Sequence, residues 1–206
     1  GVPSGVQVYA VTLGITDLEV DFKPESLFNL WVEGNPSYSV TLTNRLDKAH
    51  IEYDLFTDVV PDPPVEKVIA GVAAVMKTKP PCIIGVGGGS AIDTAKAVKK
   101  FAKQFDDKYD PRLIAIPTTS GTGSEVTRFA VISNPAEERK YPLVDEELLP
   151  DEAILDEVLV KSVPASVTAD TGMDVMTHAI EAYVSTENNE FSGALAEKAV
   201  EITGQF

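Results

Sequence analysis

The stretch that decides the fold is Cys82–Ser90, which reads CIIGVGGGS. Its first five residues have the length and apolar composition of a buried strand, and three glycines follow before a run of helical character begins. A glycine turn between a strand and a helix lets the backbone approach a pyrophosphate, which then rests at the positive end of the helix. The placement therefore predicts a nucleotide site. The alternative is a tight turn before a capped helix, because Ser90 stands where glycine or alanine would close the G-x-G-x-x-G pattern.

Around this turn, helix-like and strand-like stretches alternate as in βαβ units, which favours a mostly parallel sheet covered by helices. We expect helices over 65–77 and 90–103 and a buried strand over 113–116. Ser90 is expected to cap the second helix, with Asp93 as its capping-box partner. Further along, 129–133 and 141–144 are expected to pair as a hairpin, and 153–155 to form a short strand.

Beyond Pro164 only helical patterns remain, over 165–184 and 192–202. We therefore predict an α/β fold, with a Rossmann-like, mostly parallel sheet in residues 1–162 and the beginning of an all-helical domain in residues 163–206. The boundary is expected near 160–164. Residues 1–44 give no clean unit: 6–11 and 39–43 have strand character, and 27–32 contain the single tryptophan. Between 43 and the strand expected at 51–56 there is barely room for two helical turns.

Composition excludes several classes of protein. The 206 residues carry 17 basic and 32 acidic side chains, a formal charge of −15, which would repel nucleic acid and anionic lipid. A hydrophobic share of 44% is ordinary for a soluble globular protein, and no apolar run approaches the roughly 20 residues of a membrane span. A single cysteine, Cys82, excludes an internal disulfide, and no basic-then-apolar leader is found, so we expect a cytoplasmic protein.

A second loop, Pro117–Ser124 (PTTSGTGS), follows the strand expected at 113–116. Loops after neighbouring parallel strands lie at the same edge of a sheet, so this loop and the glycine turn are expected to face one crevice. Its hydroxyls could serve a phosphate, a ribose or an amide without adding charge. The alternative is a Ser/Thr-rich loop that satisfies its own backbone.

Asp174 and His178 are four residues apart in an expected helix, so they project from one face and could share a zinc or iron ion. Two ligands are fewer than a catalytic site usually takes. Without further context a helical Asp–His hydrogen bond is the more common explanation.

Three motifs taken together resemble the iron-containing (group III) alcohol dehydrogenases, and most closely their propanediol and ethanol dehydrogenase branch. They are the segments GGGSAIDTAK (87–96), PTTSGTGSEVT (117–127) and TGMDVMTHAIEAYVS (171–185). The resemblance runs from about Arg45 to the end of the sequence. It implies an NAD-dependent oxidoreductase, with NADP as an alternative, that also carries Fe²⁺ or Zn²⁺.

The resemblance also implies roles for individual residues. The positions that match its cofactor site are Gly88, Gly89, Ser90, Asp93, Thr118, Thr119, Thr122 and Lys140. Asp174 and His178 match the first two of four metal ligands, and the other two are histidines on later helices of the family. The only other histidine here is His50, in a different region, so the chain is expected to be incomplete after the first two ligands.

The beginning of the chain departs from the family, whose first strand ends in an acidic residue that faces the adenosine ribose. If 39–43 is that strand, Asn44 occupies this position and the helix that follows is shortened.

The implied reaction is hydride transfer between a small alcohol or aldehyde and nicotinamide, with the metal polarising the substrate oxygen. Family members commonly self-associate, so a homo-oligomer is expected. One alternative is a non-catalytic nucleotide-binding module. Another is an enzyme like glycerol dehydrogenase or dehydroquinate synthase, which the second and third motifs fit less well.

Overall fold

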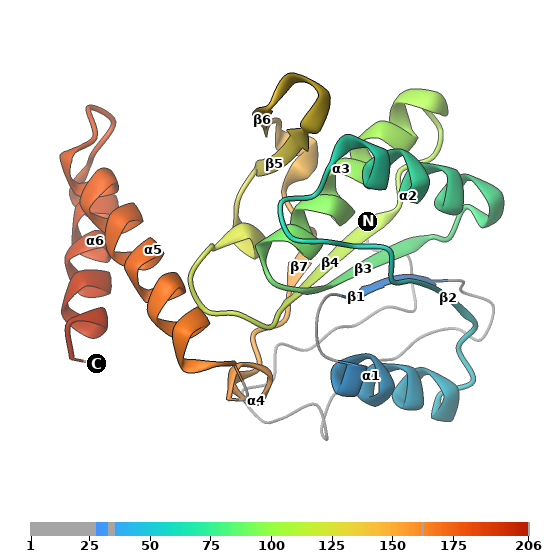
Figure 1. Ribbon diagram of the computed structural model, residues 1–206, viewed down its shortest axis with the longest axis horizontal. Coiled ribbons are helices and arrows are strands. Elements are labelled where there is room, and N and C mark those ends of the chain that lie inside the picture. Colours follow the sequence, from blue (N-terminus) through green and yellow to red (C-terminus); the bar gives the residue numbers. More distant parts are fainter. Residues whose placement is uncertain (1–27, 33–35, 162, 206) are drawn as a thin grey trace. The chain divides into compact units, whose positions relative to one another are not determined.

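The computed structural model describes residues 28–32, 36–161 and 163–205 (Figure 1). The strand expected at 6–11 lies outside these residues. Contacts divide the chain into two units: one comprises residues up to Thr118 together with Gly123–Lys161, and the other comprises Thr119–Thr122 and Ser162–Phe206.

The first unit is built on a five-stranded sheet with the order β2-β1-β3-β4-β7, in which every neighbouring pair is parallel. The strands are β1 (Phe28–Val32), β2 (Tyr53–Phe56), β3 (Cys82–Gly87), β4 (Arg112–Pro117) and β7 (Glu152–Ala153). From β1 the chain first adds β2 on one side and then returns to add β3 on the other. The strand order therefore reverses between β1 and β3, and parallel sheets form their ligand crevice at the carboxyl ends of the strands beside such a reversal.

Helices cover both faces of the sheet (Figure 1). Helix α1 (Pro36–Lys48) lies on one face, while α2 (Val65–Thr78) and α3 (Gly89–Phe105) lie on the other. Each face of the sheet packs against its helices in a separate core, and alternate residues of β3 point into the two cores. Ile84 packs with Leu46 of α1, and Ile83 packs with Val98 of α3. Because both faces are buried, the strand is apolar throughout, as the sequence predicted for 82–86.

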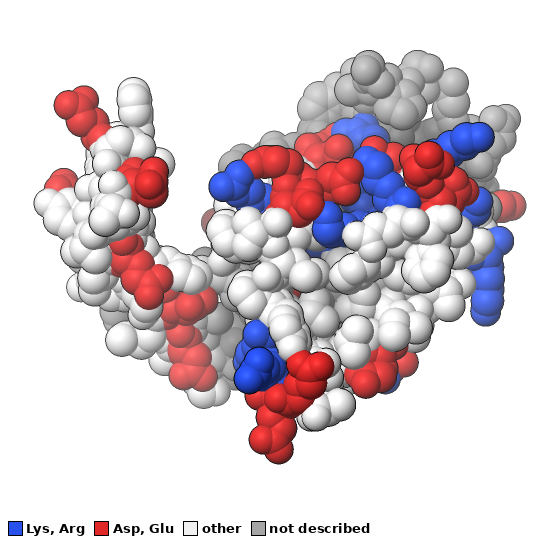
Figure 2. All heavy atoms as spheres, turned by 90° about the horizontal axis from the view of Figure 1, so that it is seen from above, with Lys and Arg blue, Asp and Glu red and all other residues white. Residues whose placement is uncertain are grey.

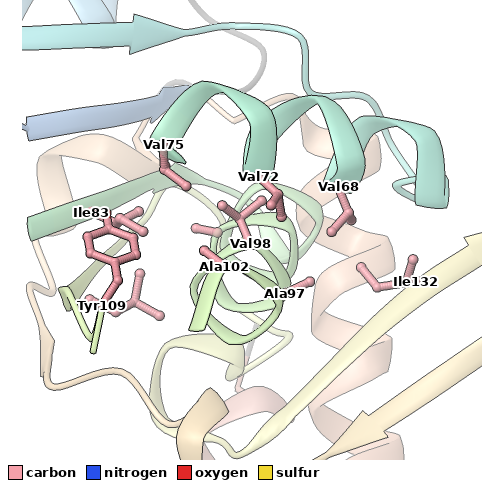
Figure 3. Packing of buried hydrophobic residues seen from close by; sticks show 11 residues of the cluster. Val68, Val72, Val75, Ile83, Ala97, Val98, Ala102, Tyr109 and Ile132 are labelled. Carbon is pink, nitrogen blue, oxygen red and sulfur yellow. The ribbon is translucent and has the colours of Figure 1, made fainter. Parts of the chain in front are cut away.

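The core between α2 and α3 is formed by small aliphatic side chains (Figure 3). Val68, Val72 and Val75 lie at helical spacing along α2 and point toward α3, where Val98 and Ala102 face them (Figure 3). Helix α3 also lies close to the sheet, since a Cβ on Gly85 would stand 3.1 Å from the Cβ of Ala95. Glycine at position 85 therefore lets α3 lie directly against β3.

After β4 the chain forms an antiparallel hairpin of β5 (Phe129–Asn134) and β6 (Arg139–Val144). Short 3-10 turns precede, join and follow its strands at η2 (Ser124–Val126), η3 (Pro135–Glu137) and η4 (Glu146–Leu148), and α4 (Glu157–Val160) ends the first unit. Ala130 and Ile132 of β5 are buried, and Ile132 packs in the core that α2 and α3 share. The predicted hairpin is therefore confirmed.

The second unit contains two helices, α5 (Ala165–Val184) and α6 (Glu190–Thr203), which pack on each other. Asn189 caps α6: its side chain accepts from Phe191 and Ser192, and the Ser192 hydroxyl accepts from the N–H of Asn189. Both helices lie where the sequence predicted them. Among the described residues, no helix combines the length and the apolar character needed to cross a bilayer.

One prediction for the beginning of the chain is wrong. Residues 39–43 are not a strand but lie inside α1, and the strand of this region is β1, paired on both sides. Leu42 and Leu46 are both buried and lie one helical turn apart, which is the pattern of an amphipathic helix. The interpretation of Asn44 as the residue at the end of the first strand is therefore also wrong, and α1 extends over 13 residues.

On the first unit, charged side chains of both signs are intermixed on the face seen in Figure 2. Ion pairs join α3 to the segment after β6, including Lys100 with Asp145 and Lys103 with Glu147. That face of the described residues therefore has no continuous basic patch.

Candidate functional site

The glycine turn connects β3 to α3 at the reversal of the strand order. Gly87 ends β3 with a φ of 150°, a conformation that favours glycine, and Gly88 is the N-cap residue of α3. The first N–H groups of an α-helix have no acceptor within the helix, and they carry a partial positive charge. A turn of this kind fits the pyrophosphate of a dinucleotide, since backbone donors and the helix end both favour an anion.

The expected capping role of Ser90 is wrong. The helix begins one residue earlier, at Gly89, and its N-cap residue is Gly88, which has no side chain to cap the helix. The Ser90 hydroxyl accepts instead from the N–H of Asp62, at 3.2 Å. Ser90 therefore connects the glycine turn to the segment that precedes α2.

Asp62 also contacts Lys140, so this lysine lies near the glycine turn. The Nζ of Lys140 donates to Oδ1 of Asp62 at 2.6 Å, and the N–H of Ser133 donates to the carbonyl oxygen of Pro63 at 2.9 Å. These bonds hold the hairpin against the segment before α2. Two residues predicted for the cofactor site, Ser90 and Lys140, thus share Asp62 as a neighbour although they are far apart in the sequence.

Thr118 lies beside the glycine turn. Gly87 and Pro117 are partners in the pairing of β3 with β4, and the N–H of Thr118 donates to the carbonyl oxygen of Gly87 at 2.9 Å. Two loops therefore begin at one edge of the sheet, as the motif order predicted. Thr119 and Thr122 belong to the second unit, so their relation to the glycine turn stays a prediction.

Within the second unit, Gly121 lies close to α5. A Cβ on Gly121 would stand 2.6 Å from both the Cβ and the carbonyl oxygen of Thr171. Only glycine allows this approach without a shift of the neighbouring backbone. Thr171 lies one helical turn before Asp174, the first of the two predicted metal ligands.

Asp93 is held by protein groups in the first unit. Its Oδ1 accepts from the Ser124 hydroxyl at 2.5 Å, and its Oδ2 accepts from the N–H of Val131 at 2.9 Å. Burial is the largest influence on this carboxyl and raises its pKa, although the two hydrogen bonds and the nearby Lys96 act in the opposite direction. The predicted capping-box role of Asp93 is wrong, because its side chain faces η2 and β5.

Asp174 and His178 do lie together on α5. The Nε2 of His178 is 3.7 Å from Oδ1 of Asp174, and about half of each side chain is exposed. A carboxylate and an imidazole suit Zn²⁺ or Fe²⁺, but among the described residues no three His, Cys, Asp or Glu side chains gather in the way that a metal site needs. The pair therefore fits part of a metal site and not a whole one.

Sequence reasoning gave no role to Asp62 or Lys96, and none to Ser124 beyond its place among the loop hydroxyls, although the structure places all three next to predicted site residues. For Lys96 the sequence did contain a signal: it follows Ile92 at helical spacing, which puts a cation on the apolar side of the helix. The structure agrees, since the Lys96 side chain is fully buried. No comparable signal pointed to Asp62, because its neighbour Lys140 is 78 residues away.

The chain matches two family models. The model described as iron-containing alcohol dehydrogenase covers residues 32–157, and the one described as the C-terminal part of the Fe-containing alcohol dehydrogenase family covers residues 168–205. The 1-propanol dehydrogenase of Citrobacter freundii is 53% identical over 152 residues, which are 74% of this chain and 41% of that protein. The NADPH-dependent butanol dehydrogenase of Clostridium saccharobutylicum is 44% identical, over 78% of this chain and 45% of its own length.

Solved structures of similar dehydrogenases share the fold of this chain. A 1,3-propanediol oxidoreductase superposes with a TM-score of 0.79 at 33% identity, covering 87% of this chain and 51% of its own. For the NADH-dependent butanol dehydrogenase A of Thermotoga maritima the TM-score is 0.75 at 28% identity, covering 87% and 50%. The chain spans about half the length of the relatives that it matches. With one family model covering more than half of its residues, this chain belongs to the iron-containing alcohol dehydrogenase family.

Proposed function

We propose that this chain is the nucleotide-binding part of an NAD-dependent, metal-containing alcohol dehydrogenase that interconverts small primary alcohols and aldehydes. NADP is the alternative cofactor, since the relatives include butanol dehydrogenases named for either NADPH or NADH. The observation that supports the proposal is the hydrogen bond from Thr118 to Gly87, because it places Thr118, near the start of the Ser/Thr-rich loop, beside the glycine turn at the strand-order reversal.

In this proposal the chain binds and orients the cofactor. Gly88, Gly89 and Ser90 receive the pyrophosphate at the start of α3. Lys140, on the neighbouring hairpin, adds a positive charge near that anion. The hydroxyls of Thr118, Thr119 and Thr122 are assigned to the ribose and the nicotinamide amide, to which they can both donate and accept.

Asp174 and His178 are proposed to supply two ligands of an Fe²⁺ or Zn²⁺ ion. When bound, such an ion polarises the alcohol oxygen as a Lewis acid. Because two side chains do not complete a site, this part of the proposal requires ligands beyond the pair. The division into a dinucleotide-binding domain (1–162) and the beginning of a helical metal-binding domain (163–206), a cytoplasmic location and self-association also belong to the proposal.

A second candidate is a nucleotide-binding module that does not catalyse. The observation that favours it is the lack of a third ligand near Asp174 and His178 among the described residues. The two candidates share the cofactor site and differ in turnover alone.

Titration with NADH and NADPH, followed by an assay of propan-1-ol oxidation with added Zn²⁺ or Fe²⁺, tests both candidates. Gly89→Asp places a carboxylate at the start of α3, which suits the helix but repels a pyrophosphate, so it should abolish binding. Ala136→Asp adds the same charge at the exposed hairpin turn and should leave binding unchanged. Binding without turnover favours the module, and failure of both cofactors to bind at millimolar concentration contradicts both candidates.

A further inference from the structure

Lys96 is a buried cation in the middle of the first unit. Its side chain is inaccessible to solvent, and it extends from α3 toward the segment between η2 and β5. The Nζ atom donates to the carbonyl oxygens of Thr127 and Phe129, both at 2.7 Å, and to the Thr127 hydroxyl at 3.3 Å. Three acceptors match the three N–H groups of an ammonium.

Asp93 acts on the same segment from one helical turn earlier. Positions three apart share a helix face, so Asp93 and Lys96 approach η2 and β5 together. Asp93 accepts from the Ser124 hydroxyl and from the N–H of Val131. Between these two points, Lys96 donates to the carbonyl oxygens of Thr127 and Phe129. The two side chains thus hold successive points of the segment 124–131.

The location of this contact matters because both partners adjoin the cofactor site. Helix α3 begins at the glycine turn, and Ser124 ends the hydroxyl-bearing loop 117–124. A loop whose far end is free would lose conformational entropy each time it bound a cofactor, whereas a loop fixed to α3 has lost that entropy in advance.

We propose that Asp93 and Lys96 are positioning residues for the cofactor: they fasten the end of the Ser/Thr-rich loop to the helix that starts at the glycine turn. This inference rests on the proposed function. It differs from the sequence-based prediction, which placed Asp93 among the residues of the cofactor site itself. Both carboxylate oxygens of Asp93 are engaged with protein donors, so its effect on cofactor is exerted through the loop.

Two variants separate this role from a purely structural one. Lys96→Met keeps the length of the side chain and removes its charge, and Asp93→Asn keeps an acceptor for Val131. Lys99→Met is the matched control. Lys99 is also nearly buried on α3, but it pairs with Asp151, at 3.0 Å, away from the loop. All three variants are expected to unfold at lower temperature, and the first two alone should bind NADH about tenfold more weakly.

The pH profile of NADH binding gives a second readout. Burial is the largest influence on Lys96 and lowers the pKa of its ammonium to about 8, although Asp93 on α3 and Glu125 on η2 act to raise it. The wild-type affinity for NADH should therefore fall between pH 7 and pH 9, as one donor and the charge are lost. Lys96→Met should show no such fall, and Lys99→Met should retain it.

Hydrogen exchange distinguishes failure of this inference from failure of the proposed function. If the chain binds no NADH, the function fails, but faster amide exchange in residues 118–128 of Asp93→Asn and Lys96→Met, and not of Lys99→Met, still supports the fastening role. The inference is overturned if the two variants, while folded, match Lys99→Met in both NADH affinity and loop exchange.

Discussion

The ammonium of Lys140 lies 2.6 Å from the carboxylate of Asp62. The backbone N–H of Asp62 donates to the hydroxyl of Ser90 at the glycine turn. The side chains of Lys140 and Asp62 are 58% and 67% exposed, so water competes for both ions. Exposed ion pairs of this kind contribute little to stability. The pair therefore leaves Lys140 able to exchange its partner for a phosphate.

Replacing Lys140 with Met should weaken NADH binding severalfold and reduce its dependence on salt, because one attraction to the pyrophosphate is lost. The melting temperature should hardly change. Lys161→Met provides the control, since Lys161 forms a pair with Glu157 in the same unit that is at least as exposed. Titrations at low and high salt check this. Equal effects of the two substitutions on affinity would argue against a role for Lys140.

Gly121→Ala should destabilise the second unit by about 1–3 kcal/mol, the usual cost of overpacking, because the new methyl group would collide with Thr171. Gly172, which follows Thr171 in α5, provides the control. A Cβ there meets nothing within 4 Å, so Gly172→Ala should stabilise α5 by about 0.5–1 kcal/mol. Urea unfolding followed by circular dichroism measures both. Shifts of the same sign would contradict the close contact.

The buried thiol of Cys82 should make stability depend on pH. Burial, the largest influence, raises the folded-state pKa from 9.0 to about 12. Between these values the folded chain keeps a proton that the unfolded chain loses, so the contribution is full below pH 9 and is lost as the pH rises toward 12. From pH 8 to pH 10, wild type should lose about 1.4 kcal/mol more than Cys82→Ala. Parallel losses in urea titrations at the two pH values would refute this.

Zinc should bind weakly to this chain and through one histidine only. Asp174 and His178 offer two ligands, which are too few for tight binding. In a Zn²⁺ titration followed by NMR, the imidazole signals of His178 should shift while those of His50 stay in place. His178→Ala and Asp174→Asn should remove the effect, and dialysis should remove the metal from wild type. Retention of one zinc ion after dialysis of either variant would show that the ion binds elsewhere.

The central part of the fold followed from local signals. The apolar run of β3, the valines of α2 and the hairpin were predicted because each carries its own periodicity or turn chemistry. The predicted class, a mostly parallel sheet followed by helices, is confirmed, and so is the family resemblance. These features depend on residues that are close together in the sequence.

The predictions that were wrong depended on distant contacts. Residues 39–43 alternate polar and apolar side chains like a strand, but Leu42 and Leu46 pack in one core with Ile84 of β3, and this burial stabilises a helix instead. Ser90 and Asp93 match a capping box, yet Asp62, Ser124 and Val131 provide other partners for them. Those partners lie 28 to 38 residues away, and nothing in the local pattern announces them.

The central place of β1 in the sheet determines the order in which the fold can form. Phe28–Val32 is flanked by β2 and β3, both of which come later in the chain. During synthesis this strand therefore emerges from the ribosome well before either neighbour, and its backbone groups must wait for residues 53–87 to be translated. Parallel pairing over such separations is slow, and unpaired strands can associate with other chains in the meantime. Until residue 87 has been translated, β1 therefore lacks one of its two neighbours, and its unpaired backbone groups are open to other chains.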